Sequence, residues 1–147
     1  MNGNTRSSIN SAVLDTSVLM EVLGNTRLGE TVKNVVLKDP AMERFYISPL
    51  AVTELLYLVA RTAGFQVALQ QVEGFTKVFT ICEEKELRVE AARMKTALAL
   101  SLADCYALAI GSLRGIPVYF KREMEFDAML KKGPIPFPID LRFVDDL

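Results

Sequence analysis

The chain has 147 residues, half of them hydrophobic, which fits one globular domain over residues 1–147 with a sizeable core. With 17 basic and 18 acidic residues its net charge is −1, so no global positive field attracts nucleic acid, and any such contact must be local. The sequence contains no histidine, which excludes Ser/His/Asp triads, Cys/His dyads, histidine-based ribonucleases and histidine zinc sites.

Two further features concern the environment of the protein. Cys82 and Cys105 lie far apart without a CxxC pattern, and no signal peptide precedes them, which predicts reduced thiols in a cytoplasmic protein. The most apolar stretch, residues 96–113, is interrupted by Asp104 and is rich in Ala and Ser. We therefore expect a core helix there and no membrane span.

In chain order, a polar tail over residues 1–10 precedes alternating strand-like and helix-like segments. The alternation predicts an α/β fold: a three-layer α/β/α sandwich whose sheet of about five strands is parallel. The functional crevice of such a sheet lies beyond the carboxyl ends of its strands. Helices are expected after each of the first four strands, and the strands are expected at residues 11–15, 44–48, 78–82, 117–120 and 141–144.

The first strand ends at an acid, in "AVLDTSVLMEVL" over residues 12–23. The apolar run before Asp15 suits a buried strand, and the residues after it suit the start of a helix. Asp15 is therefore expected at the crevice.

A second acid, Glu54, belongs to the helix expected after the second strand. Ser48 followed by Pro49 is typical of a helix start, which places Glu54 in the second turn among leucines. A carboxylate with such neighbours is a candidate functional group. The alternative is a structural glutamate that pairs with Arg61 or lies at the helix edge.

A third acid, Asp104, opens the apolar helix. Ser101 and Asp104 have the spacing of a capping box, in which the acid answers an exposed backbone amide. This capping role is the alternative to a catalytic one. The two roles are compatible, because an acid in the first turn points out of the helix toward the crevice edge.

The fourth candidate lies in "PVYFKREMEFD", after the fourth strand. Glu123 comes three residues after Phe120 and is the acid best placed to lean back over the strand ends. Glu125 and Asp127 are expected in a solvated loop or first helical turn, where the helix dipole favours acids.

Four carboxylates in one crevice would repel one another unless a cation neutralised them. A ligand set of oxygen atoms, without histidine or cysteine, suits Mg2+ or Mn2+ rather than Zn2+. Such a cation can activate water and neutralise charge on a phosphoryl group, which is the chemistry of phosphodiester hydrolysis.

From about Val13 onward, the segments "VLDTSVLMEVL", "ISPLAVTELL", "LSLADCYALAIGSLRGIPVY" and "KREMEF" resemble the motif series of the PIN domain family, which includes the VapC-type ribonuclease toxins. The resemblance implies an endoribonuclease dependent on Mg2+ or Mn2+ that leaves 5′-phosphate and 3′-hydroxyl ends. It also implies a homodimer and, for a toxin, an antitoxin partner. The catalytic and metal-binding acids implied are Asp15, Glu54, Asp104 and Glu123, with Thr16 and Ser17 supporting them.

The sequence departs from the family pattern at Lys121, where Thr or Ser is common, at the fourth acid, which is Glu where Asp is more usual, and in its longer N-terminal tail. Lys121 and Arg122 adjoin the site and are candidates for contact with RNA phosphates. We expect the Lys121 ammonium to point inward, where it would compete with the cation. Lys121 leaves open an alternative, a PIN-fold module that binds RNA or protein without cutting. The longer tail leaves open whether the protein is a toxin.

Two other classes with aspartates at strand ends fit less well. A haloacid-dehalogenase-type phosphatase needs a second Asp two residues after the first, where this chain has Ser17. A receiver domain needs an Asp at the end of a middle strand, where this chain has "YISPL".

Overall fold

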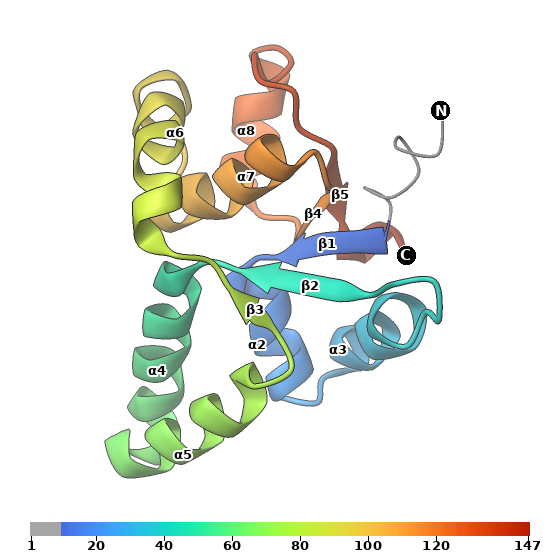
Figure 1. The fold of residues 1–147 in the computed structure, drawn as a ribbon, viewed down its shortest axis with the longest axis vertical. Helices are drawn as coiled ribbons and strands as arrows, with labels where there is room; N and C mark the ends of the chain where they lie inside the picture. Colours follow the sequence, from blue (N-terminus) through green and yellow to red (C-terminus); the bar gives the residue numbers. More distant parts are fainter. Residues whose placement is uncertain (1–9) are drawn as a thin grey trace.

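The computed structural model describes residues 10–147, so the predicted polar tail lies outside the described residues except for Asn10. The described elements alternate as predicted, with helices after each of the first four strands (Figure 1). The strands are β1 Ser11–Leu14, β2 Arg44–Ile47, β3 Thr80–Ile81, β4 Val118–Phe120 and β5 Leu141–Phe143. The helices are α2 Thr16–Leu23, α3 Arg27–Val32, α4 Pro49–Ala63, α5 Phe65–Thr76, α6 Glu84–Ala97, α7 Leu102–Arg114 and α8 Met124–Lys131, with a π-helix at Lys33–Leu37 and a 3-10 turn at Val144–Asp146.

All strand pairs are parallel, in the order β3-β2-β1-β4-β5. The sheet grows from β1 toward β2 and β3 on one side and toward β4 and β5 on the other. The connections therefore reverse direction between β1 and β4. At such a switch point the loops at the carboxyl ends of the two strands diverge and leave a crevice.

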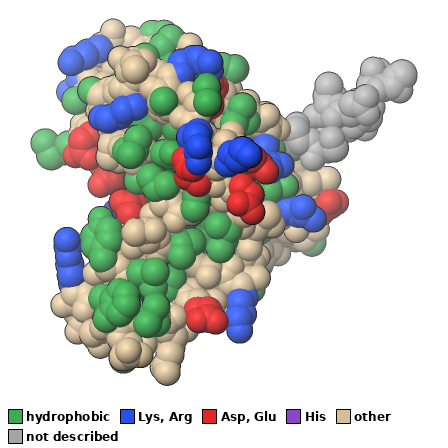
Figure 2. All heavy atoms as spheres, turned by 60° about the vertical axis from the view of Figure 1, so that its left-hand side comes forward, with side chains coloured by type: hydrophobic (Ala, Val, Ile, Leu, Met, Phe, Trp, Pro, Cys, Tyr) green, Lys and Arg blue, Asp and Glu red, His purple; other side chains and the backbone are tan. Residues whose placement is uncertain are grey.

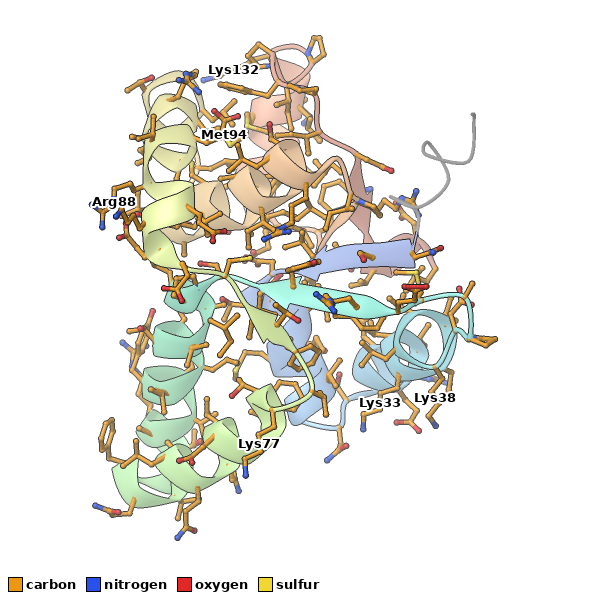
Figure 3. The ribbon with its side chains drawn as sticks, viewed as in Figure 1. Lys33, Lys38, Lys77, Arg88, Met94 and Lys132 are labelled. Atoms are coloured by element: carbon orange, nitrogen blue, oxygen red, sulfur yellow. The ribbon has the colours of Figure 1, made fainter. Side chains whose placement is uncertain are left out.

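Helices cover both faces of the sheet, and successive side chains of β1 pack into opposite layers. Val13 belongs to the core beneath α6, α7 and α8, whereas Ala12 and Leu14 belong to the core beneath α2, α4 and α5. Figure 3 shows the first of these cores from the side, with Met94 directed from α6 toward α7 and α8. The fold is thus the predicted α/β/α sandwich.

The predicted core helix is α7, which begins at Leu102 and is buried from Cys105 to Gly111. The first residues of the apolar stretch, 96–101, instead end α6 and connect the two helices. No single helix between residues 10 and 147 is long and apolar enough to cross a membrane. Helices α6 and α7 would suffice together by length and composition, but the chain bends by 119° between them.

Gly111 determines how closely α7 approaches the sheet. A Cβ atom at this position would lie 2.1 Å from Val118 Cγ2 and 3.1 Å from the carbonyl oxygen of Ile116. A side chain there would push α7, and the acid it carries at its first turn, away from β4.

We predict that Gly111→Ala lowers the free energy of unfolding by about 1–3 kcal/mol, because it overpacks the contact between α7 and β4. Gly74→Ala in α5 is the matched control, since a Cβ there meets no atom within 4 Å. The control should be neutral or stabilising by up to about 1 kcal/mol. Urea unfolding of both variants measures the difference, and equal stabilities would contradict the packing argument.

Candidate metal and active site

The four predicted acids and both supporting hydroxyl residues line one cavity of about 230 Å³ at the carboxyl edge of the sheet. In Figure 1 this is the region where the arrowheads of β1 and β2 meet the upper end of α4. The structure therefore brings together residues from four separate segments of the sequence. The lining consists of Asp15, Thr16, Ser17, Met20, Glu54, Leu58, Ser101, Asp104, Glu123 and Glu125.

Asp15 is the most deeply placed of these acids, with 4% of its surface exposed. It is the N-cap of α2, and its Oδ2 accepts a hydrogen bond of 3.0 Å from the backbone amide of Ser17. Burial raises the pKa of Asp15 from its ordinary 3.8 to about 7, with a further contribution from the charge of Asp104. The hydrogen bonds of Ser17 oppose this rise and the charge of Glu54 adds to it.

Asp104 lies in the first turn of α7, as the capping-box spacing predicts. The Ser101 hydroxyl accepts a hydrogen bond of 3.1 Å from the Asp104 backbone amide. Burial raises the pKa of the Asp104 carboxyl from 3.8 to about 6; hydrogen bonds with Ser101 oppose the rise, and the charges of Glu123 and Glu54 add to it. Asp104 thus belongs both to a helix cap and to the group of interacting acids.

Glu54 is held by a neighbour from another element. The Thr16 hydroxyl donates a hydrogen bond of 2.5 Å to Glu54 Oε1, which links the start of α2 to the second turn of α4. Arg61, offered above as the partner of Glu54 in the structural alternative, instead places its guanidinium 4.8 Å from the centre of the Tyr57 ring. The hydrogen bonds of Glu54 in the described residues therefore favour a role in the cavity.

Glu123 is the N-cap residue of α8 and lies on the exposed side of the cavity. Its pKa is raised, mainly by desolvation and then by the charge of Glu125, while Lys121 lowers it. Glu125 also lines the cavity, although its place in a charged helix start had suggested solvated surface. The only sequence feature that could have indicated a place for Glu125 in the cavity is its spacing of two residues from Glu123. This feature is weak, because the first turn of a surface helix commonly carries acids.

The two basic candidates both have acidic partners. The Lys121 ammonium binds Glu21 Oε2 at 3.1 Å and is absent from the cavity lining, so the expectation that it points into the acids is wrong. The Arg122 guanidinium lies 4.1 Å from the centre of the Phe143 ring. It also pairs with Asp127 and Asp146 at 3.0 Å each.

The donor set suits a hard divalent cation, because it consists of carboxylate and hydroxyl oxygen atoms. Burial is the main cause of the raised pKa values of Asp15 and Asp104, and the charges of neighbouring acids add to it; a bound cation would stabilise the ionised carboxylates against both effects. Within residues 10–147, no three acidic or cysteine side chains are close enough together to form a metal-ligand cluster as they stand. The acids surround the cavity without forming such a cluster.

The fold and the cavity define an α/β protein with an acidic site at the switch point of a parallel sheet. The chain belongs to the PIN domain family, whose model matches residues 12–129. A comparison with curated protein sequences finds no match.

Solved structures share this fold at low sequence identity. The DNA-bound VapBC structure from Salmonella typhimurium is similar with a TM-score of 0.67 and 18% identity, over 92% of this chain and 99% of that chain. FitAcB from Neisseria gonorrhoeae is similar with a TM-score of 0.63 and 19% identity, over 92% of this chain and 99% of that chain. VapC20 from Mycobacterium tuberculosis is described as a sarcin-ricin loop cleaving toxin. It is similar with a TM-score of 0.62 and 18% identity, over 80% of this chain and 93% of that chain. At these identities the likeness establishes the fold.

The raised pKa of Asp15 predicts how stability depends on pH in the metal-free protein. A folded-state pKa above the unfolded value means that the folded state binds more protons, so stability from this group is full below pH 4 and is lost as pH rises through about 7. The loss amounts to roughly 4 kcal/mol for a shift of this size.

We predict that Asp15→Asn, which keeps the N-cap acceptor, removes this loss. The variant should be more stable than the wild type at pH 8 in the presence of a chelator, and the difference should shrink toward pH 4. Urea unfolding across this range is the measurement. Parallel pH profiles for the two proteins would contradict the assignment of the raised pKa to Asp15.

Proposed function

We propose that this protein is a metal-dependent endoribonuclease that hydrolyses RNA phosphodiester bonds with Mg2+ or Mn2+. The observation that carries the proposal is the convergence of Asp15, Glu54, Asp104 and Glu123 on one cavity, where burial and mutual repulsion raise the pKa of three of them. Membership of the PIN domain family supports it. The similarity to VapC20, which is described as a sarcin-ricin loop cleaving toxin, supports RNA as the substrate class.

In this proposal Asp15, Glu54, Asp104 and Glu123 hold the cation, directly or through water. When bound, the cation supplies charge neutralisation at the phosphoryl group and lowers the pKa of a coordinated water. The remaining groups position the acids: the Ser17 amide fixes one oxygen of Asp15, and the Thr16 hydroxyl fixes Glu54. The Ser17 hydroxyl accepts a hydrogen bond of 3.0 Å from the Lys121 amide, which ties the start of α2 to the end of β4.

We further propose that the protein acts in the cytoplasm as the toxin of a toxin–antitoxin pair and forms a homodimer. The VapBC and FitAcB neighbours support an antitoxin partner. Figure 2 shows hydrophobic side chains gathered on the face of α4 and α5, and an exposed apolar surface is typical of a protein interface. The exposed large apolar residues of these helices are Tyr57, Phe65, Val67 and Leu69.

The second candidate function is a PIN-fold module that binds RNA or a protein without cutting. The observation that favours it is the absence of a closed metal cluster among residues 10–147, together with Lys121 at the position where the family commonly has Thr or Ser. An assay for RNA cleavage with and without Mg2+ or Mn2+ separates the two candidates, since only a nuclease would cleave RNA when the metal is added.

We predict that Asp15→Asn and Asp104→Asn each lower the rate of RNA cleavage by about a hundredfold or more, because each removes a charge that organises the transition state. Glu73→Gln on the exposed surface of α5 is the control for loss of one negative charge and should cleave normally. Cleavage of a labelled RNA by purified proteins, with circular dichroism to verify folding, is the measurement. Wild-type rates in either aspartate variant would overturn the catalytic assignment.

We also predict that Mn2+ binds the wild-type protein at millimolar or lower concentration and raises its melting temperature, because only the folded state presents the acids together. Asp15→Asn should lose most of both effects. Isothermal titration calorimetry and thermal unfolding measure them. RNA binding by a protein that shows no response to Mn2+ or Mg2+ would favour the non-cutting module.

A further inference from the structure

Lys121 is fixed at both ends, although it stands beside the acidic cavity. Its backbone amide donates to the Ser17 hydroxyl at 3.0 Å, and its ammonium binds Glu21 Oε2 at 3.1 Å. The Glu21 side chain is 19% exposed and the Lys121 side chain 41%, so solvent screens this pair incompletely. Lys121 thus has a definite orientation, along α2 and away from the cavity.

Glu21 is an unusual residue for its position, since it lies in the second half of α2 where the helix dipole disfavours an acid. Two hydrogen bonds stabilise its charge: the Thr26 hydroxyl donates to Oε1 at 2.6 Å, and Lys121 donates to Oε2. These contacts lower the pKa of Glu21, with Thr26 as the larger cause. Glu21 is therefore ionised at neutral pH.

The corner between α2 and α3 holds this arrangement in place. The Thr26 hydroxyl also caps α3 by accepting a hydrogen bond of 3.0 Å from the Gly29 amide. A Cβ atom on Gly29 would lie 2.0 Å from the Glu21 carbonyl oxygen, so the close approach of α3 to α2 requires glycine at this position. The Glu21 side chain is therefore held by the residue that caps α3 at the corner between the two helices.

Without Glu21 the Lys121 ammonium would have a strong alternative partner. Glu123, two residues further along the chain, lines the cavity together with Asp15, Glu54 and Asp104. The lysine side chain is long and flexible, and a group of carboxylates attracts its ammonium. An ammonium in the cavity would neutralise part of the carboxylate charge and so compete with a divalent cation for it.

We propose that Glu21 is a positioning residue that holds the Lys121 ammonium outside the acidic cavity and so keeps the carboxylates available to a divalent cation. The inference rests on the metal site of the proposed function. It also explains how a lysine is compatible with that site at a position where the family commonly has a small hydroxyl residue.

The test is a double-mutant cycle on Mn2+ affinity, measured by calorimetry and by electron paramagnetic resonance of free Mn2+ in the absence of RNA. We expect Glu21→Gln, which keeps an oxygen for Thr26, to weaken Mn2+ binding by about tenfold. In the Lys121→Thr background the same substitution should change the affinity by less than about twofold, because no ammonium remains to enter the cavity. Glu30→Gln, which removes a carboxylate from the exposed Lys33 pair, controls for net charge and should bind normally.

Equal effects of Glu21→Gln in both backgrounds would overturn the inference, because they would show a simple contribution of the Glu21 charge. Unchanged affinity in Glu21→Gln would also overturn it while leaving the metal site intact. If the wild-type protein binds no Mn2+, the proposed metal site and the inference both fail. Circular dichroism of all four variants verifies that each comparison is made between folded proteins.

Discussion

The burial of several mutually repelling carboxylates at the carboxyl edge of a parallel sheet is the constraint on which the site depends. Helices cover both faces of the sheet, so the loops at its carboxyl edge are where polar side chains can converge. Asp15 is held there with almost no exposure, next to Asp104 and Glu54. Ionising all three carboxylates without a counter-charge is unfavourable. The fold tolerates the three acids because a bound proton or cation can neutralise part of their charge.

Helix starts supply the local stabilisation that makes this arrangement tolerable. Asp15 caps α2, Asp104 lies in the first turn of α7, and Glu123 precedes α8 as its N-cap residue. The amino end of a helix carries partial positive charge and free backbone amides, both of which favour an acid. The capping and catalytic interpretations of Asp104 are therefore two consequences of one placement, and a substitution that keeps the cap can separate them.

The sequence was sufficient for the architecture because the strongest patterns are local. The apolar run that ends at Asp15 gave β1 and the start of α2, and the Ser48–Pro49 pair gave the start of α4. The third strand was predicted over residues 78–82 but is confined to Thr80–Ile81, since it is an edge strand with a single neighbour. The π-helix at Lys33–Leu37 had no signal, because its apolar and polar residues fit an ordinary helical turn.

Local sequence patterns could not predict the contacts between side chains from distant segments of the chain. Nothing in the residues around Lys121 indicates that its partner is Glu21, because the pairing depends on the angle between α2 and the end of β4. The sequence favoured an inward lysine, and the pairing with Glu21 beside the α2–α3 corner directs it outward instead. A residue that departs from a family pattern is therefore interpreted correctly only together with the side chain that holds it. Here that side chain is Glu21, which lies a hundred residues earlier, in the helix that follows Asp15.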